Sequence, residues 1–143
     1  MKEAVGNLWT YPAQARVITT NGAVRSDGRA VMGRGVALQA KTRYADIDLA
    51  LGKLIRLEGN HVHLIPCVVP IISFPVKRVW HEKADPKLIT RSVEELAALV
   101  QRRGWRTIVL PRPGCGNGGL DWGDVKPLLE RALDNRFIVV NPR

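Results

Sequence analysis

The sequence has 143 residues, of which 45% are hydrophobic and 24% charged, the balance of an ordinary soluble protein. This length predicts a single domain, residues 1–143, that can bury its own core. No apolar run approaches the roughly 20 residues of a bilayer span, and the first residues lack the apolar segment of a secretory signal, so we expect neither. The two cysteines, Cys67 and Cys115, form no CxxC pair and fit a reducing compartment. We therefore expect a cytoplasmic protein, monomeric and without a bound metal or cofactor.

Basic residues outnumber acidic ones, 22 to 13, and give a formal net charge of +9. Such a balance favours polyanionic partners or substrates. The charges are scattered along the chain and are not gathered in one arm or stripe. A generally basic surface with no special partner therefore explains them equally well.

The first part of the chain alternates apolar runs with turns. Glu3–Leu8 predicts a short strand that ends in a turn, and the β-branched run Ala15–Thr20 predicts a buried strand that ends at Asn21-Gly22. After a polar turn at 25–29, the segment Met32-Gly-Arg-Gly-Val36 opens a helix. The apolar face of that helix would consist of Val36, Ala37, Ala40 and Tyr44.

The middle of the chain is rich in β-branched residues. Lys53–Leu57 and His61–Pro66 predict a hairpin around a turn at 58–60, and Val68–Phe74 predicts a further strand. Pro75–Trp80 would then leave the sheet as a loop.

A longer helix and two strands follow. Asp85-Pro86 predicts the start of the helix, with proline at the first helical position, and Gly104 predicts its end. Its sheet-facing stripe would consist of Val93, Leu96, Ala97 and Val100. The apolar runs Thr107–Pro111 and Arg136–Asn141 predict two more buried strands.

A glycine-rich loop, Arg112–Trp122, lies between the first of these two strands and an amphipathic segment, 125–133. Asp124 is the preferred N-cap of that last helix over Asp121, because Pro127 then falls in the first turn. Strands that alternate with helices, in continuous apolar runs, predict an α/β fold. The expected architecture is a three-layer α/β/α sandwich around a mixed central sheet.

Two segments, Met32–Val36 and Arg112–Trp122, are glycine loops with the composition of a phosphate site. Glycines let backbone N–H groups turn toward one point, and a helix N-terminus behind them adds partial positive charge. The spacing is neither Gly-x-Gly-x-x-Gly nor a P-loop, and either loop alone could be a plain turn. Because the arrangement of strand, glycine turn and helix occurs twice, we expect one pyrophosphate to be held between the two loops.

Four stretches resemble the macrodomain family: Val17–Gly22, Met32–Gln39, Phe74–Lys77 and Pro113–Trp122. Within that family they resemble most the DarG-like branch of DNA ADP-ribosylglycohydrolase antitoxins, and the similarity covers essentially the whole chain. The resemblance implies an ADP-ribose cleft at the C-terminal edge of the sheet, where open α/β sheets generally bind ligands.

The resemblance also implies roles for individual residues. Asn21 would hold the distal ribose, since an amide both donates to and accepts from hydroxyls; the alternative is a turn residue at a strand end. Asn7 and Leu8 lie where the family binds adenine, and Asn7 would accept a hydrogen bond without the charge of the aspartate found in many macrodomains. The two diphosphate loops would be formed by Gly33, Arg34, Gly35 and Val36, and by Gly114, Cys115, Gly116, Asn117, Gly118, Gly119 and Leu120.

Lys77 is the candidate catalytic residue, together with Asn21 for positioning. It matches the lysine that the antitoxin branch uses in hydrolysis, where the amine would polarise an oxygen or attack the anomeric carbon. The alternative is a solvated loop lysine next to Arg78. Some related hydrolases add an aspartate inside the second glycine loop, but that place is Gly118 here, so Asp121 is at most a weak substitute.

The other residues with reactive side chains can be explained without a catalytic or metal-binding role. His61 and His63 would share one face of a strand, but no third ligand stands near them, which disfavours a metal site. His81, near Trp80, could contact a nucleobase or protein leaving group, or could be an ordinary loop residue. Trp9, Trp80 and Trp105 could stack bases, but aromatic residues make up only 6% of the chain and show no RNA-binding pattern. Cys115 has no base at a readable spacing, so we interpret it as a small packing residue.

The leading hypothesis is an ADP-ribosyl hydrolase that removes ADP-ribose from nucleic acid, most specifically from a DNA base, by a lysine-dependent mechanism. The partner would be ADP-ribose or an ADP-ribosylated macromolecule. Two alternatives remain open at this point: a phosphatase acting on ADP-ribose 1″-phosphate, and a reader that binds ADP-ribose without turnover.

Overall fold

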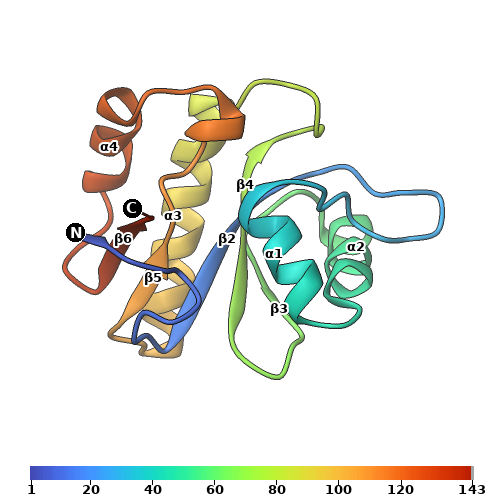
Figure 1. The fold of residues 1–143 in the computed structure, drawn as a ribbon, viewed down its shortest axis with the longest axis horizontal. Coiled ribbons are helices and arrows are strands. Elements are labelled where there is room, and N and C mark those ends of the chain that lie inside the picture. Colours follow the sequence, from blue (N-terminus) through green and yellow to red (C-terminus); the bar gives the residue numbers. More distant parts are fainter. Residues whose placement is uncertain (143) are drawn as a thin grey trace.

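The computed structural model describes residues 1–142 and shows a six-stranded sheet with helices on both faces (Figure 1). The strands are β1 (Lys2–Val5), β2 (Ala15–Asn21), β3 (His63–Ile65), β4 (Ile71–Lys77), β5 (Ile108–Leu110) and β6 (Phe137–Asn141). Their spatial order is β1-β6-β5-β2-β4-β3. All neighbouring strands are parallel except β3, which pairs antiparallel with β4 at one edge. The predicted mixed sheet is confirmed.

The helices form two outer layers. α1 (Gly35–Arg43) and α2 (Ile47–Glu58) cover one face, and α3 (Pro86–Arg103) and α4 (Trp122–Glu130) cover the other (Figure 1). Successive strand residues point to opposite faces, so in β2 Val17 packs in the core under α3 and α4 while Ile18 packs in the core under α1 and α2. The three-layer α/β/α architecture is thereby confirmed. No helix of residues 1–142 combines the length and the apolar character needed to cross a membrane.

Helix α3 begins and ends where the sequence predicts. The Asp85 side chain accepts a hydrogen bond from the Lys87 N–H at 2.9 Å, and Pro86 occupies the first turn. Gly104 ends the helix in the left-handed region, with φ of 69°. Such capping residues are strong local signals because they satisfy backbone groups that the helix itself leaves unpaired.

The predicted strand at Lys53–Leu57 is wrong, because this segment forms the second half of α2. Ile47 and Leu51 are buried at helical spacing, whereas Leu57 is almost fully exposed. The hairpin exists one strand later, where β3 pairs with β4.

Strand β4 extends further than expected. Pro75 lies inside it, so the prediction of a loop at 75–80 is wrong for its first three residues. β3 pairs with β4 over residues 71–73, so Pro75 lies beyond the end of β3. A missing N–H therefore removes no bond to β3 at this position. This extension carries Lys77 to the end of the strand.

The predicted N-cap of α4 is also wrong. The helix begins at Trp122 with Asp121 as N-cap, and Pro127 lies in its interior. The Asp121 carbonyl accepts from the N–H groups of Asp124 and Val125, which establishes the first turn ahead of the proline.

Candidate functional site

A cleft of about 590 Å³ lies at the carboxyl ends of β2, β4 and β5. In parallel strands these ends meet at one edge of the sheet. The segment Val31–Ala37 forms one wall of the cleft, and residues of the loop that follows β5 form the other. Both glycine loops singled out in the sequence therefore border the same space.

The first wall ends in the N-terminus of α1. Arg34 is the N-cap in an extended conformation and makes no side-chain cap hydrogen bond. Gly35 opens the helix with φ of 54°, a conformation that favours glycine. The first turn contains no acidic residue, and its N–H groups have no partner within the helix, so this end of α1 can accept an anion.

The second wall is a tight loop. Gly114 and Gly116 have φ of 74° and 72°, and a Cβ on Gly114 would lie 2.8 Å from Cδ1 of Ile89, too close for a side chain. A Cβ on Gly35 would lie 3.5 Å from Nδ2 of Asn117. The two loops thus approach each other directly across the cleft.

The last two residues assigned to this loop lie outside the cleft wall. The Leu120 N–H donates to the Gly114 carbonyl at 3.0 Å, and the Leu120 side chain packs on the core under α3 and α4. Gly119 ends the short helix η1 (Gly116–Gly118) with φ of 77°. Both residues close the loop, and the part of the loop that borders the cleft is Gly114–Gly118.

Asn21 and Lys77 are neighbours at the far end of the cleft. A register shift after Thr20 pairs Asn21 of β2 with Lys77 of β4. Lys77 Nζ lies 3.4 Å from the carbonyl oxygens of Trp80 and Asn117, so the amine stands between β4 and the second glycine loop. The sequence predicted that these two residues would share the cleft, and the structure places both in its lining.

The Asn21 amide is held from both sides. Its Oδ1 accepts from the Ala23 N–H at 2.9 Å, and its Nδ2 donates to the Val31 carbonyl at 3.1 Å. Asn21 thus makes the turn contacts that the alternative interpretation describes, and its contact with the ribose stays a prediction. One amide proton and one oxygen lone pair remain for a ligand, and their direction is fixed.

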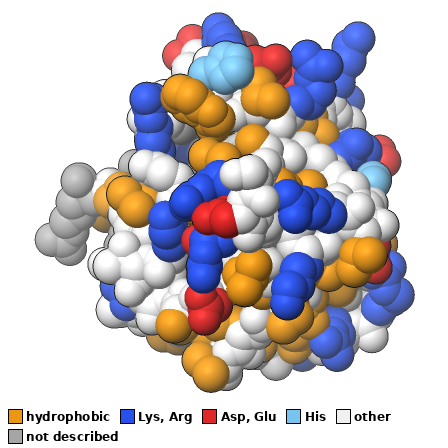
Figure 2. Space-filling view, turned by 90° about the vertical axis from the view of Figure 1, so that its right-hand side faces the viewer, with side chains coloured by type: hydrophobic (Ala, Val, Ile, Leu, Met, Phe, Trp, Pro, Cys, Tyr) orange, Lys and Arg blue, Asp and Glu red, His pale blue; other side chains and the backbone are white. Residues whose placement is uncertain are grey.

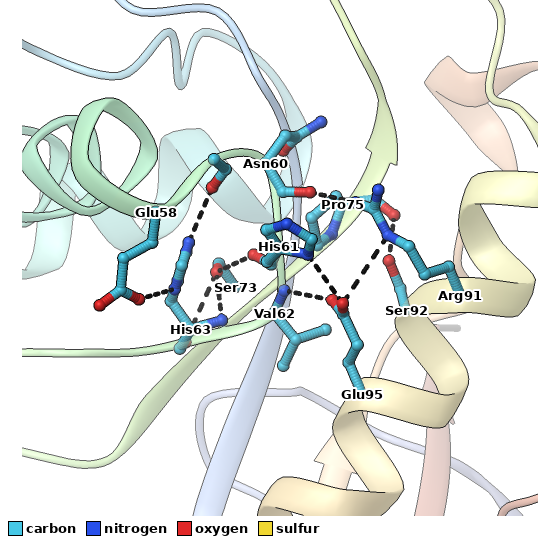
Figure 3. A network of polar contacts seen from close by, with 11 residues as sticks. Glu58, Asn60, His61, Val62, His63, Ser73, Pro75, Arg91, Ser92 and Glu95 are labelled. Carbon is cyan, nitrogen blue, oxygen red and sulfur yellow. Dashed lines mark hydrogen bonds and ion pairs between the residues drawn. The ribbon is translucent and has the colours of Figure 1, made fainter.

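A polar network that includes Asn60, Arg91 and Glu95 (Figure 3) contacts the end of β4. Asn60 Nδ2 donates to the Lys77 carbonyl at 3.0 Å. The Asn60 side chain also packs against Gly22, where a Cβ would lie only 2.8 Å from Cγ of Asn60. Arg91 of α3 donates through Nη2 to the Asn60 carbonyl. Asn60 thus joins the ends of β2 and β4 to the helix behind them.

The two histidines belong to the same network. His61 Nδ1 lies 2.7 Å from Oε2 of Glu95, and His63 Nε2 lies 2.9 Å from the Gly59 carbonyl (Figure 3). Within the part of the chain that the structure describes, no three metal-ligating side chains come together. The histidines serve here as hydrogen-bonding residues that fix the segment before β3.

The charged side chains of the cleft are all basic. Arg34, Lys77 and Arg112 line it, and among residues 1–142 no Asp or Glu does. Asp121 is the N-cap of α4 and does not contribute to the lining. On the side of the molecule where α2 lies, Lys and Arg side chains are spread over the surface with fewer acidic ones between them (Figure 2). The cleft therefore favours an anionic guest.

Cys115 lines the cleft but is not an activated nucleophile. Burial raises the pKa of its thiol, and the opposing influence of Arg112 is smaller. A thiol with a raised pKa remains protonated near neutral pH. Its Sγ lies 3.7 Å from the Pro113 carbonyl, which agrees with the packing role expected from the sequence.

Asn7 and Leu8 border a second pocket of about 420 Å³. Val36 and Pro111 line both pockets, so the two spaces adjoin. Oδ1 of Asn7 already accepts from the Trp9 N–H at 2.8 Å, so its amide can contribute one further lone pair and two protons.

Sequence reasoning missed two residues of this site, Arg112 and Asn60, and it left the role of a third, Trp80, open. Arg112 lines the cleft and stacks its guanidinium 5.1 Å from the ring centroid of Trp122. Trp80 also lines the cleft, and Asn60 supports Lys77 from behind. Arg112 could have been noticed, since it opens the glycine loop; the contact of Asn60 depends on the path of a hairpin that the sequence predicted incorrectly.

The family model of the Macro domain matches residues 26–129 of this chain. The chain belongs to the Macro domain family. The matched range includes the first glycine loop, Lys77 and the second glycine loop, so the family assignment covers both walls of the cleft.

This macrodomain is also similar to individual proteins. It is 33% identical over 137 residues to a DNA ADP-ribosyl glycohydrolase of Thermus aquaticus, a match that covers 90% of this chain but 36% of that relative. The solved macrodomain of Thermus aquaticus DarG has 30% identity and a TM-score of 0.81, covering 97% of this chain and 95% of that one. The macrodomain of Mycobacterium tuberculosis DarG has 28% identity and a TM-score of 0.80, covering 100% and 99%. The chain thus spans about a third of the curated relative and nearly the whole of each solved macrodomain.

Proposed function

We propose that this macrodomain binds ADP-ribose and hydrolyses the bond that links its distal ribose to a DNA base. The observation that carries the proposal is the pair of glycine loops that face each other across a cleft with basic side chains and no carboxylate among residues 1–142. The name of the Thermus aquaticus relative, DNA ADP-ribosyl glycohydrolase, supports the choice of reaction and of substrate.

The order of the features along the cleft supports a matching order for the parts of ADP-ribose. The diphosphate would lie between Gly33–Val36 and Gly114–Gly118, where backbone N–H groups and the helix end favour anions. The adenine would occupy the adjoining pocket beside Asn7 and Leu8. The distal ribose would then reach Asn21 and Lys77 at the opposite end.

Lys77 would act on the anomeric carbon. Its amine can donate a proton or hydrogen bond to the departing base, or attack the carbon as its bond to the base breaks, after which water releases the ribose. Some related hydrolases use an aspartate of the second glycine loop together with the lysine. Among residues 1–142 no carboxylate lines the cleft, so we do not propose that route here. The fixed amide of Asn21 would hold the ribose hydroxyls in position for either step.

We further propose that the chain acts as a monomer in the cytoplasm. Its two cysteines are free, which suits a reducing compartment. Size-exclusion chromatography with light scattering would test the oligomeric state, and a mass of twice 15.9 kDa would contradict it.

The decisive variant is Lys77→Ala. We expect it to bind free ADP-ribose nearly as well as the parent but to release ADP-ribose from a modified single-stranded oligonucleotide more slowly, by on the order of 10²-fold or more. Calorimetry would give the affinity and chromatography of the released nucleotide the rate. Lys53→Ala, an exposed lysine of α2 outside the cleft, is the matched control.

The same assay separates the competing functions. The parent would be incubated in parallel with ADP-ribosylated DNA, ADP-ribosylated protein and ADP-ribose 1″-phosphate. Equal cleavage of DNA by the parent and Lys77→Ala would refute the lysine mechanism. Preferred turnover of the 1″-phosphate would indicate the phosphatase, and binding without turnover of any substrate would indicate a reader.

A further inference from the structure

Trp80 is the one large aromatic side chain of the cleft lining among residues 1–142. It is 50% exposed, although a tryptophan carries the largest apolar surface of any side chain. Its ring is supported from the side by His81, with ring centroids 5.2 Å apart and planes at 79°. A supported but uncovered indole at the rim of a cleft offers a free face to a flat ligand.

The loop that carries Trp80 is tied down at both ends. The Gly22 N–H donates to the Arg78 carbonyl at 2.9 Å, next to the end of β2. On the other side, the Ala84 N–H donates to the Gly118 carbonyl at 2.9 Å, which joins the loop to the second glycine loop. Trp80 therefore belongs to a short segment that is held at both ends. Because this segment is already ordered, it loses little conformational entropy when a ligand stacks on the indole.

Trp80 lies next to Lys77, at the end of the cleft where the proposed reaction takes place. Its own carbonyl oxygen lies 3.4 Å from Nζ of Lys77. If the distal ribose lies against Lys77, the group attached to the anomeric carbon must leave the cleft on this side. The side chain of Trp80 would then be among the first surfaces that the leaving group meets.

The charges around Trp80 favour a polyanion. Glu82, the acidic residue of the loop, is neutralised by Arg78 at 3.4 Å. Lys83 lies along the second glycine loop, with its Cε 3.5 Å from the position of a Cβ on Gly119, and has no carboxylate partner in the described chain. Phosphates on either side of a stacked base could pair with such a lysine.

We propose that Trp80 is the platform on which the modified nucleobase stacks, so that it selects ADP-ribosylated single-stranded nucleic acid over ADP-ribosylated protein. This inference rests on the proposed function, since it concerns the leaving group of the same reaction. A base presents a flat π-face to the indole whatever its identity, whereas a carboxylate or other small side chain does not.

The test measures affinity, so it does not depend on turnover. In the Lys77→Ala background, dissociation constants would be determined for free ADP-ribose, for a single-stranded oligonucleotide with one ADP-ribosylated base, and for a peptide with an ADP-ribosylated glutamate. Each would be repeated with Trp80→Ala and Trp80→Phe added. Leu57→Ala, which removes an apolar side chain outside the cleft that is more exposed than Trp80, serves as the control.

We expect Trp80→Ala to raise the dissociation constant for the oligonucleotide about ten-fold or more relative to that for free ADP-ribose, and Trp80→Phe to restore most of this loss. An equal loss for all three ligands would overturn the proposal, because Trp80 would then only shape the ADP-ribose site. A loss confined to the peptide, or no loss at all, would also overturn it. If the parent cleaves no modified DNA, the proposed function fails while this comparison of affinities still decides the role of Trp80.

Discussion

Asn21 and Lys77 show how backbone contacts fix the side chains of the candidate site. The Asn21 amide accepts one hydrogen bond from Ala23 and donates one to Val31. These two bonds fix the direction of the amide proton and the oxygen lone pair that remain. Lys77 is held through its carbonyl by Asn60, while its amine contacts two other carbonyls. Positioning of this kind lowers the cost of reaching the reactive geometry.

Asn60 is therefore expected to act as a positioning residue. Asn60→Asp keeps the size of the side chain but replaces the donor to the Lys77 carbonyl with an acceptor. We expect kcat on modified DNA to fall about ten-fold, with the dissociation constant for free ADP-ribose within about three-fold of the parent.

A merely structural role would give a different result for the same variant. It would lower the melting temperature and the fraction of active protein, but kcat per active site would be unchanged. Active-site titration with ADP-ribose therefore has to accompany the rate measurement. Asn135→Asp, at an exposed turn far along the chain, is the matched control.

At the residue scale, the sequence predicted the parts of the site that form local motifs. The glycine loops, Asn21 and Lys77 occupy the one cleft, and their ligand contacts stay predictions. Asn60 could not be predicted, because it lies in the segment before β3 while its partner Lys77, 17 residues away, ends β4. Contacts of this kind follow from tertiary structure and leave no periodic signal in the sequence.

Helix α2 depends on a close contact between two backbones. A Cβ on Gly52 would lie 2.0 Å from the Gly28 carbonyl oxygen and 3.0 Å from the Ala30 nitrogen. The helix therefore lies directly against the segment that leads to the first glycine loop. Arg29 strengthens this contact through Asp48, at 2.8 Å, whose carboxylate is almost fully buried.

Gly52→Ala is expected to destabilise the protein in spite of the better helix propensity of alanine. The gain from propensity is about 1 kcal/mol, but the added methyl must displace a backbone carbonyl, and overpacking costs about 1–3 kcal/mol or more. Urea unfolding should show a lower midpoint with an unchanged slope.

Gly123→Ala in α4 is the control for this substitution, since a Cβ there meets no atom within 4 Å. It should leave the midpoint unchanged or raise it. Equal effects of the two substitutions would contradict the proposed contact between α2 and the 28–30 segment.

The elements predicted correctly are those with strong signals at their ends. α3 has an aspartate cap, an initial proline and a terminal glycine, and all three act as expected. α2 begins at Ile47 after an N-cap residue, Asp46, that lies in the left-handed region and makes no side-chain cap hydrogen bond. Its start was therefore missed, and its second half was interpreted as a strand. β4 contains Pro75, which lies beyond the end of β3 and so removes no hydrogen bond to that strand, a condition that the sequence does not show.

At the scale of the whole molecule, Glu3 joins the first strand to the last helix. Its carboxylate accepts from Trp122 Nε1 at 2.9 Å and pairs with Lys126 Nζ at 2.8 Å, which ties β1 to α4. These hydrogen bonds, led by that of Lys126, hold the pKa of Glu3 below its ordinary value of 4.5. The contribution of Glu3 to stability is thus present above pH 4.5 and is lost as the pH falls through the lowered pKa of the folded state.

Glu3→Gln should therefore lower the melting temperature at neutral pH by about 1–3 °C, a modest value because the pair is partly exposed. The difference from the parent should shrink as the pH falls below 4.5. Thermal melts between neutral and acid pH would measure it, with Glu94→Gln as control because Glu94 has no ion-pair partner in residues 1–142. A difference that stays constant with pH would contradict the assignment.

The register shift between β2 and β4 makes this end of the sheet sensitive to length as well as to composition. Thr20 pairs with Pro75 and Asn21 with Lys77, so β4 accommodates one extra residue, Val76, at this point. Removing a single residue here would turn the lysine toward the opposite layer, since successive strand positions face opposite ways. We therefore expect a substitution around the cleft to disturb the position of the amine less than an insertion or deletion in β4. A change in chain length would disturb it less in the connection between β3 and β4.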